Sequence, residues 1–410
     1  MNKIRLSEVA TVELSSIDKK IEASEIPVKL CNFTDVYYNW SITKNVVDAC
    51  MDGSVNDTEY SKFSLKKGQV AITKDSETRD DIGMSTYISE DFDNAVLAYH
   101  CALITPKQGK VNGKYLNALF NDSYGRRYFA NQASGSGQRY TLSKEAIESI
   151  EIPLPSIEKQ NAIGSFFSNI DKKIELNNRI NDNLIEQART LFNYWFLQFN
   201  FPDDNGRPYL SSGGNMVFSP ELKRLIPTNW GTTTVEKICL CHDSKRVPLS
   251  SNERLSMHGD YPYFGATDVM DHVNNYIFDG DYVLLAEDGS IMDKSGHPIL
   301  QRIQGKCWIN NHAHVLEPVA GYSCLLLYML LKDIPVIKIK TGSVQYKITQ
   351  EKLNQFCIVD IPNDIRQSFI SLTDPIDKQI LKLKKENENL KQLRDWLLPM
   401  LMNGQVSISN

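Results

Sequence analysis

Two stretches of the chain, one near its middle and one near its end, carry the same pattern of apolar and polar residues. IDKKIELNNRINDNL begins at Ile170 and IDKQILKLKKENENL begins at Ile376, and the two align without a gap. In both stretches apolar residues recur in steps of three and four, which places them along one helix face and is typical of a coiled-coil seam. The pattern predicts two long helices with matching seams.

The two seams place an asparagine at equivalent points, Asn181 and Asn387. A buried amide at such a position fixes the register and orientation of a helix pair at some cost in stability. We therefore expect an antiparallel intramolecular coiled coil, with a pseudo-twofold axis relating the two halves of the chain. The alternative is that each helix covers only its own domain. The predicted seams are Phe167, Ile170, Ile174, Asn177, Asn181, Leu184, Ala188, Leu191 and Trp195, and then Ile376, Ile380, Leu383, Asn387, Leu390, Arg394, Leu397 and Leu401.

The repeat extends into the segment before each helix. TLSKEAIESIEI at Thr141 aligns with KITQEKLNQFCI at Lys347, and after a short slip GQVAITKD at Gly68 aligns with GDYVLLAE at Gly280. Self-similarity of this kind indicates repeated structural units. The chain is therefore expected to hold two copies of one design, each a globular segment followed by a long helix. In the second register His100 and Pro106 fall opposite His312 and Pro318, and Asp75-Ser76 falls opposite Glu287-Asp288.

Each globular segment mixes strand-like and helix-like patterns, which predicts an α+β class. Residues 69–72, 95–104, 282–286 and 314–316 read as strands, and residues 115–129 and 325–331 read as helices. Prolines close each segment because proline removes an amide donor and restricts the residue before it. The expected divisions are a first globular segment at 1–150, a first helical region at 151–200, a polar connector at 201–228, a second globular segment at 229–361, a second helical region at 362–404 and a tail at 405–410.

Composition narrows the class of protein. The chain has 410 residues, of which 41% are hydrophobic and 23% are charged, as in ordinary globular proteins. It has neither an apolar run long enough for a membrane span nor an apolar leader, so we expect a cytosolic protein. The net charge of −5 argues against a protein that is basic over its whole surface, but it leaves room for local basic faces that bind nucleic acid.

Candidate nucleic-acid contacts lie mainly just before each helical region. A Ser/Thr-Gly-Ser triplet followed by Gln occurs in both copies, and glycine permits close backbone approach while hydroxyl and amide groups suit phosphates or base edges. The competing interpretation is a turn that begins the last strand or helix of the segment. The candidate residues, with neighbouring cations, are Arg126, Arg127, Ser134, Gly135, Ser136, Gln138, Arg139, Tyr140, Arg302, Lys338, Lys340, Gly342, Ser343, Gln345 and Lys347.

Catalytic and metal-binding signals are weak. The Cys239-Leu-Cys241-His242 and His312-Ala-His314 clusters favour buried thiols and hydrogen-bonded histidines over metal ligands. Gly109 to Lys114 is one residue short of a phosphate-binding loop. No metal site and no catalytic residue is therefore predicted. Aromatic residues at Phe192, Trp195, Phe196 and Trp396 are either partner-docking anchors or internal core, and the sequence does not separate these two interpretations.

Several segments are similar to one known family. IPLPSIEKQNAIGSFFSNIDKKIELNNRINDNLIEQARTLFNYWF from Ile152, the connector FNFPDDNGRPYLSSGG, IPTNWG at Ile226 and LKQLRDWLLPMLMNGQV from Leu390 resemble the specificity subunit of Type I restriction–modification enzymes. The resemblance covers nearly the whole chain in order, and the helical regions are its specific part. It implies that 1–150 and 229–361 are target recognition domains.

The resemblance implies a non-catalytic reader of double-stranded DNA. Each recognition domain would bind one half of a bipartite, asymmetric target, and the paired helices, roughly 30 to 35 residues or about 45–53 Å long, would set the spacer. The subunit would dock two methyltransferase subunits and the restriction and translocase subunits, which would carry S-adenosylmethionine, ATP and Mg²⁺. The chain contains no Asn-Pro dipeptide, so the Asn-Pro-Pro-aromatic motif of adenine-N6 methyltransferases is absent from it. Two alternatives stay open, a duplicated coiled-coil scaffold that binds only proteins and a decoy subunit with degraded recognition domains.

Overall fold

The computed structural model describes residues 3–135, 138–343 and 345–408. The chain divides into two compact units, and each is treated by itself below. Unit 1 comprises Met1–Arg179 and Leu383–Asn410, and unit 2 comprises Ile180–Lys382. Both division points fall inside long helices, so each of these helices contributes one half to each unit.

Unit 1 is built on a sheet of mostly antiparallel strands in the order β2-β10-β6-β8-β4. Val70, Ile72, Ala102 and Ile104 are fully buried on this sheet because helices and the adjoining core cover it. The strands are β2 (Ala10–Leu14), β10 (Cys101–Pro106), β6 (Val70–Thr73), β8 (Ser85–Ile88) and β4 (Ser41–Ile42). Smaller sheets join β5 (Met51–Val55), β3 (Ile26–Cys31) and β9 (Ala95–Leu97), and also β1 (Lys3–Arg5) and β13 (Glu151–Pro153).

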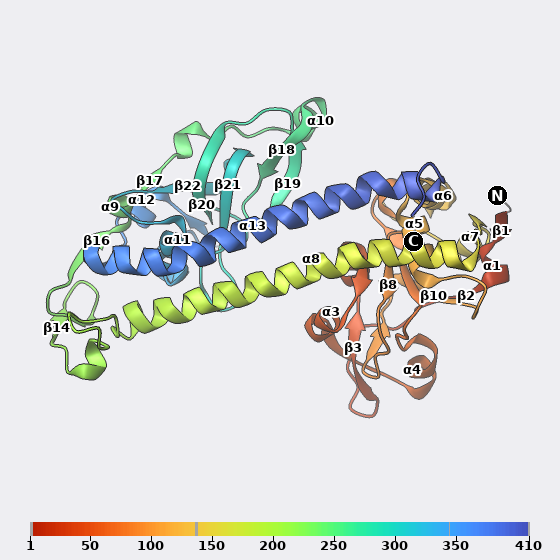
Figure 1. Ribbon diagram of the computed structural model, residues 1–410, viewed down its shortest axis with the longest axis horizontal. Coiled ribbons are helices and arrows are strands. Elements are labelled where there is room, and N and C mark those ends of the chain that lie inside the picture. Colours follow the sequence, from red (N-terminus) through yellow and green to blue (C-terminus); the bar gives the residue numbers. More distant parts are fainter. Residues whose placement is uncertain (1–2, 136–137, 344, 409–410) are drawn as a thin grey trace. The chain divides into compact units, whose positions relative to one another are not determined.

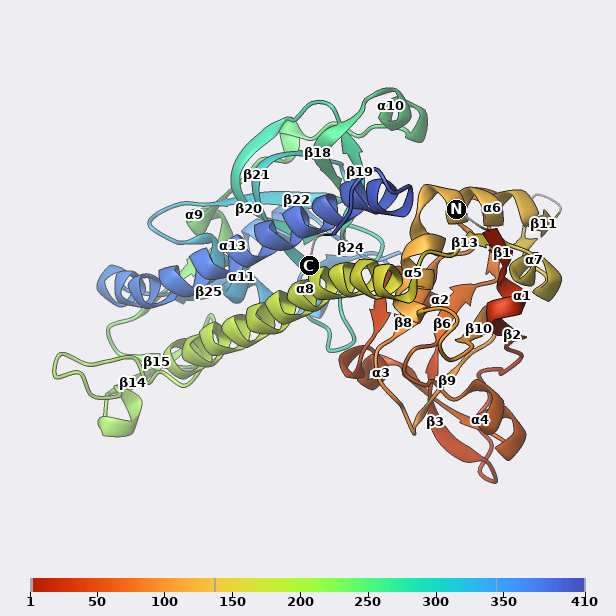
Figure 2. The same ribbon diagram turned by 45° about the vertical axis from the view of Figure 1, so that its right-hand side comes forward.

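Helix α5 (Gly113–Asn121) links this sheet to the first half of α8 (Ile157–Phe192), as Figure 2 shows. Gly164 makes the approach possible, since a Cβ there would lie 2.7 Å from the Cβ of Lys114. Tyr115 of α5 and Phe167 of α8 belong to one buried cluster. The other helices of unit 1 are α1 (Leu6–Val9), α2 (Phe33–Tyr38), α3 (Lys44–Ala49), α4 (Asp57–Phe63), α6 (Ser123–Gln132) and α7 (Lys144–Glu148).

Unit 2 repeats the central part of this design. Its main sheet has the order β17-β22-β20-β21-β18-β19, in which the first four strands correspond to β2-β10-β6-β8 of unit 1. The apolar helix α11 (Cys324–Lys332) contacts β20, β21 and β22. The strands are β17 (Cys239–Cys241), β22 (Ala313–Pro318), β20 (Phe278–Ala286), β21 (Leu300–Ile309), β18 (His258–Phe264) and β19 (Val269–Val273). Pairs β16 (Gly231–Thr234) with β25 (Cys357–Asp360) and β14 (Met216–Ser219) with β15 (Arg224–Pro227) complete the unit, together with α9 (Val235–Ile238), α10 (Ser251–Ser256) and α12 (Gln350–Asn354).

In unit 1 the first half of α8 packs antiparallel to the second half of α13 (Asn363–Met402). Ile170 and Ile174 share a buried cluster with Leu398 and Leu401, and Lys173 pairs with Glu386 at 3.3 Å. In unit 2 the other halves meet, where Phe192 of α8 and Phe196 just after it pack edge-on against Phe369 of α13. The ribbons of α8 and α13 can be followed in Figure 1. The predicted α+β class and the packed helix pair are confirmed, whereas the pseudo-twofold axis stays a prediction.

Most predicted seam positions are buried, including Asn181, Ile380 and Asn387, while Leu184 and Leu390 are half-buried. Three expectations were wrong in detail. The run 95–104 is two strands, because His100 between them adopts a φ of 72° that ends β9. The stretch 115–129 is two helices, since Asp122 ends α5 and caps α6 through its carboxylate. The connector 201–228 contains the β14–β15 hairpin, and Phe201 and Ile226 reach the core.

In the described ranges 3–135, 138–343 and 345–408, every helix is too short or too polar to cross a bilayer.

Candidate nucleic-acid interface

The triplet of unit 1 forms a short hairpin. β11 (Ser134–Gly135) pairs with β12 (Tyr140–Thr141), which in turn pairs with β7 (Asp75–Ser76). A Cβ at Gly135 would lie 2.1 Å from the carbonyl oxygen of Arg139, so the glycine is needed for the hairpin itself. Ser134, Gly135, Gln138 and Arg139 are exposed, Tyr140 is half-buried, and Ser136 lies outside the described residues.

The matching triplet of unit 2 forms an equivalent hairpin. β23 (Lys340–Thr341) pairs with β24 (Lys347–Ile348). Gly342 has a φ of 84°, and a Cβ there would lie 2.3 Å from the carbonyl oxygen of Gln345. Gly342, Ser343, Gln345 and Lys347 are exposed, and the Nζ of Lys340 lies 3.3 Å from the centre of the Tyr346 ring. The prediction of a turn is confirmed, and contact with DNA stays a prediction.

A histidine and an aspartate pair beside each hairpin. In unit 1 the Nδ1 of His100 lies 2.8 Å from the Oδ2 of Asp75, and in unit 2 the Nδ1 of His312 lies 2.8 Å from the Oδ1 of Asp288. Each pair is framed by an equivalent backbone hydrogen bond, from Lys74 to His100 in unit 1 and from Glu287 to His312 in unit 2. The repeated arrangement shows that the two copies share a local site as well as a sheet.

The hairpins are tied to these pairs by their backbones. The amide of Leu142 donates to the carbonyl of Lys74 at 2.8 Å, and the amide of Ile348 donates to the carbonyl of Glu287 at 2.9 Å. These bonds match Lys74 with Glu287 and therefore Asp75 with Asp288. The sequence alignment had placed Asp75 opposite Glu287 and was one residue out, because His100 follows its aspartate at a distance one residue longer than His312 does.

Electrostatics at the first site hold Asp75 ionised. Burial alone raises the pKa of Asp75, but hydrogen bonds from His100 and Thr141 and the charge of Lys74 outweigh it, and the net pKa is lowered. The Nη2 of Arg139 lies 2.6 Å from the Nδ1 of His100 and 3.6 Å from Asp75. The predicted cation at 139 therefore sits over the pair with its side chain exposed to solvent.

In unit 2 the charge network centres on Glu287, the residue before Asp288. Its carboxylate pairs with the Nη1 of Arg246 at 2.7 Å and with the Nζ of Lys347 at 2.8 Å. Burial raises the pKa of Glu287, yet the bonds from Lys347 and Arg246 lower it overall. The hydrogen bond to Glu287 raises the pKa of Lys347, which remains charged at the hairpin edge.

A sequence model of the Type I restriction modification DNA specificity domain matches residues 1–186 and 227–392, which include both hairpins and both histidine–aspartate pairs. The chain belongs to this family. The Type I restriction enzyme MjaIX specificity subunit of Methanocaldococcus jannaschii is 27% identical over 74% of this chain and 71% of that protein. The Type I restriction enzyme HindI specificity subunit of Haemophilus influenzae is 30% identical over 87% of this chain and 91% of that protein.

The fold agrees with this assignment. The crystal structure of the S subunit of a Type I restriction–modification system from M. genitalium superposes with a TM-score of 0.51 over 98% of this chain and 95% of that one. At 14% sequence identity this likeness concerns the fold alone. The family match and the relatives confirm the resemblance to Type I specificity subunits.

Two of the predicted contact residues of this specificity subunit have internal partners instead. The guanidinium of Arg126 donates to the carbonyls of Asp80 and Ile82, at 2.7 and 3.3 Å. Arg302 forms a two-pronged ion pair with Asp377 of α13, whose atoms approach to 2.5 and 2.8 Å. Both guanidinium groups join structural elements, and their contact with DNA stays a prediction. The side chain of Arg127 is exposed, and its contact with DNA stays a prediction.

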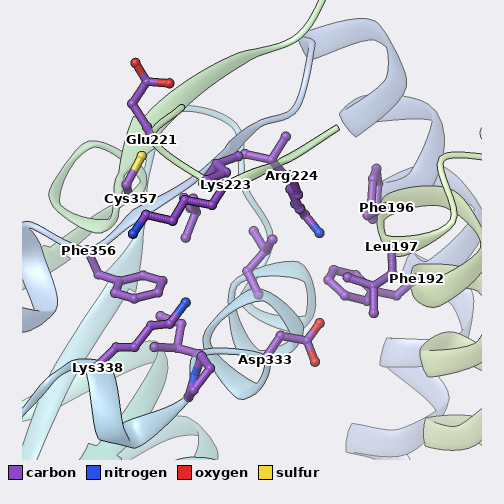
Figure 3. A pocket seen from close by; sticks show the side chains of 16 residues that line it. Phe192, Phe196, Leu197, Glu221, Lys223, Arg224, Asp333, Lys338, Phe356 and Cys357 are labelled. Carbon is purple, nitrogen blue, oxygen red and sulfur yellow. The ribbon is translucent and has the colours of Figure 1, made fainter. Parts of the chain in front are cut away.

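Lys338 lies in a different place from the hairpin. It lines a cavity of 630 Å³ in unit 2 together with Lys223 and Arg224 of the connector (Figure 3). Asp333 supplies a negative charge on the opposite side from Lys223. Lys338 is exposed two residues before β23, and its contact with DNA stays a prediction.

The aromatic anchors separate into two groups. Phe192, Trp195 and Phe196 are at most 5% exposed and form core, so the docking interpretation was wrong for them. The side chain of Trp396 on α13 is 59% exposed, so partner docking stays a prediction for this residue. The difference arises because Phe192 and its neighbours face Phe369 in the seam, whereas Trp396 lies off it.

The two histidine–aspartate pairs were not predicted from the sequence. The signal that could have found them was the alignment of His100 with His312, but the partner aspartates lie more than twenty residues earlier in the chain. The two histidines of His312-Ala-His314 have different partners. His312 faces Asp288 while His314 faces Asp243, because His312 lies before the start of β22 and only His314 belongs to that strand. His242 pairs with Glu317 at 2.5 Å and is thereby separated from Cys239.

Proposed function

We propose that this specificity subunit reads a bipartite, asymmetric DNA target, with one half-site bound by each unit. The observation that supports this most is the repeated hairpin, held by an equivalent backbone hydrogen bond beside an equivalent histidine–aspartate pair in each copy. A protein with two copies of one exposed polar hairpin has two matching places to engage one duplex.

The hairpins have suitable chemistry for base and phosphate contact. A two-stranded ribbon fits the major groove of B-DNA, where amide and guanidinium groups discriminate base edges. Gln138 and Arg139 in unit 1, and Gln345 and Lys347 in unit 2, are exposed on the hairpins. Local cations of this kind reconcile DNA binding with a net charge of −5.

The chain acts as a non-catalytic subunit in this proposal. Two methyltransferase subunits would supply S-adenosylmethionine and adenine-N6 chemistry, and restriction and translocase subunits would supply ATP and Mg²⁺. Exposed Trp396 on α13 is the proposed anchor for a partner, since tryptophan is enriched among interface hot spots, and exposed Leu393 of the same helix adds apolar surface.

A domain exchange tests the division of labour. Replacing residues 1–150 with the corresponding part of another specificity subunit should change one half of the methylated target and leave the other half and the spacer unchanged. Methylome sequencing of cells carrying each version reads both halves at once. A change in both halves would contradict the proposal.

The helix pair is proposed to set the spacer. Inserting one heptad into each helical region would lengthen the pair by about 10 Å, at 1.5 Å per residue. The spacer should then grow by about three base pairs at 3.4 Å each, while both half-sites persist. An unchanged spacer in an active complex would remove the helices from this role.

The main alternative is a duplicated coiled-coil scaffold that binds only proteins, and the acidic net charge favours it. Titration of the chain with its methyltransferase partner against duplex DNA at several salt concentrations separates the two. Tight, sequence-dependent and salt-sensitive binding supports the DNA reader, and its absence supports the scaffold. A decoy subunit is excluded if deleting the gene abolishes genomic methylation.

A further inference from the structure

Three different metal-ligating side chains converge in unit 2, away from the hairpin surface. Cys241 ends β17, Asp243 follows two residues later, and His314 lies on the neighbouring strand β22. The ligand atoms of all three lie within 4.8 Å of one another. His314 is 1% exposed, and Cys241 and Asp243 are half-buried.

The histidine and the aspartate are oriented from behind. The Nε2 of His314 lies 2.9 Å from the carbonyl oxygen of Ile348, and this contact turns Nδ1 towards the Oδ2 of Asp243, 2.5 Å away. The other oxygen of Asp243 accepts a hydrogen bond from the amide of Val315 at 3.1 Å. A carbonyl that fixes the distal nitrogen of a histidine, and a hydrogen bond to the distal oxygen of a carboxylate, are the usual supports of metal ligands.

The equivalent positions of unit 1 carry apolar residues only. Strand pairing sets Val12 opposite Ile104 in unit 1 and Cys241 opposite Leu316 in unit 2, and Pro106 corresponds to Pro318. By that register Val12, Leu14 and Ala102 occupy the places of Cys241, Asp243 and His314. Because the same sheet forms with an apolar trio, the fold does not require the polar one. The polar trio is therefore an addition in unit 2 that the shared fold leaves unexplained.

The nature of the ligands selects the metal. Thiolate, imidazole and carboxylate together suit Zn²⁺, whereas Mg²⁺ and Ca²⁺ prefer sites made of oxygen alone. Arg246 lies at the edge of the cluster, 3.3 Å from Asp243 and 2.7 Å from Glu287, and balances their charges.

We infer that Cys241, Asp243 and His314 bind one Zn²⁺ ion in unit 2. A fourth ligand comes from water or from Glu287, whose Oε2 lies 3.9 Å from the Nδ1 of His314. The ion joins β17 to β22 and, through the hydrogen bond of His314 to Ile348, steadies the hairpin of this unit alone. Its role is structural, and the equivalent described residues of unit 1, Val12, Leu14 and Ala102, offer no metal ligand.

The direct test uses the purified full-length chain. After removal of metal with a chelator, the chain is loaded with Zn²⁺ and washed, and the bound metal is counted by mass spectrometry. We expect about one Zn²⁺ per chain, as a single three-residue site requires. Loading with Co²⁺ should give a thiolate-to-cobalt charge-transfer band and the strong visible bands of a tetrahedral site. A wild-type chain that retains no Zn²⁺ and gives no Co²⁺ band would show that Cys241, Asp243 and His314 form only a hydrogen-bonded network.

Variants locate the site. Cys241→Ser should abolish the charge-transfer band, and His314→Ala should lower Zn²⁺ retention at least tenfold, as the loss of a ligand or its support does. Cys239→Ser and His312→Ala are matched controls, because Cys239 bonds to the carbonyl of Val235 and His312 faces Asp288. A band that survives Cys241→Ser, or disappears with Cys239→Ser, would overturn the assignment. These measurements need no DNA, so their outcome is independent of the proposed reading of a target.

Discussion

The side-chain amide of Asn177 donates a hydrogen bond to the Oδ1 of Asn387 across the helix pair of unit 1, over 2.9 Å. Asn387 in turn donates to Asn178 at 2.8 Å, and Asn177 also donates to Glu386 at 3.0 Å. Asn177 and Asn387 are both buried. Because any other sliding position would leave these amides unpaired in the seam, they specify one register of α8 against α13.

Substituting one of the two amides should therefore cost more than substituting both. Asn387→Ala leaves the Asn177 amide without its seam partner, and we expect a loss of about 1–3 kcal/mol in the free energy of unfolding. The double variant Asn177→Leu/Asn387→Leu should recover most of that loss, since an apolar pair needs no partner. Urea unfolding of the three proteins measures both effects. Equal losses in the single and double variants would rule out the coupling.

Arg302 should behave as a structural residue. Its ion pair with Asp377 is largely buried, so Arg302→Ala strands the carboxylate and should destabilise the chain by about 3–5 kcal/mol. The double variant Arg302→Met/Asp377→Leu should restore much of the stability. The slope of DNA affinity against salt should not change in the double variant. A slope reduced by about 1 would instead indicate a phosphate contact at Arg302.

Asp75 makes part of the stability of unit 1 dependent on pH. Its pKa is lowered below the ordinary value of 3.8, although burial, the largest single influence, raises it. A lowered folded-state pKa contributes stability above the unfolded-state pKa near 3.9, and this contribution is lost as the pH falls through the folded value. Asp75→Asn should thus destabilise the chain by about 1–3 kcal/mol at neutral pH, with a gap that closes on acidification. Asp52→Asn, at an 80% exposed carboxylate, is the control with little expected effect.

Substitutions of the two hairpin glycines, Gly135 and Gly342, should each affect recognition of one half-site. Gly342→Ala brings a Cβ against Gln345 in a left-handed conformation, so the hairpin of unit 2 must distort. We expect affinity for the target to fall at least tenfold, with discrimination lost at one half-site only, and Gly135→Ala to do the same at the other. Binding to duplexes altered in one half at a time measures this. Gly231→Ala is the control, because its Cβ would meet Asp360 at an ordinary 3.9 Å. Loss at both half-sites from a single change would refute the assignment of one hairpin to each half.

Trp396 and Trp195 should separate assembly from folding. Trp396→Ala removes an exposed side chain, and we expect unchanged stability with at least tenfold weaker binding to the methyltransferase subunit. Trp195→Ala empties a core position beside Phe369 and should cost about 3–5 kcal/mol in stability. Thermal unfolding and pull-down titration distinguish the two. Intact assembly of the Trp396 variant would place the docking surface elsewhere.

The sequence predicted the helices well because a heptad pattern is local. The heptad spacing of seam residues such as Ile174 and Asn387 predicts that they are buried, and the structure confirms this. The pairing of Asn177 with Asn387 could not be read in the same way. It depends on how two distant helices are offset, and the alignment of Asn181 with Asn387 pointed to a different residue. Asn181 is buried, and its Oδ1 finds no hydrogen-bond partner among the described residues.

The sites were predicted less completely than the helices. The hairpins were recognisable because Gly135 and Gly342 are required by local geometry. Whether a given Lys or Arg pairs internally or stays exposed could not be predicted from the sequence. Arg302 pairs with Asp377 of α13, whereas Lys347 is exposed to solvent. Cys241 and His314 belong to strands separated by most of a globular segment, so only the fold brings them together.

The boundary between the two units falls inside the two long helices, and this affects which recombination events between related genes leave a functional protein. Unit 2 is one uninterrupted stretch, Ile180–Lys382, whereas unit 1 is assembled from both ends of the polypeptide. A genetic exchange with two crossovers inside the helix-coding segments would carry a whole second unit into a related gene, with its share of both helices already matched. A single exchange that runs from the start of the gene into the first helix would separate Ile170 and Ile174 from the closing residues against which they pack. Recombination should therefore leave functional mosaics more often at the centre of such genes than at their start.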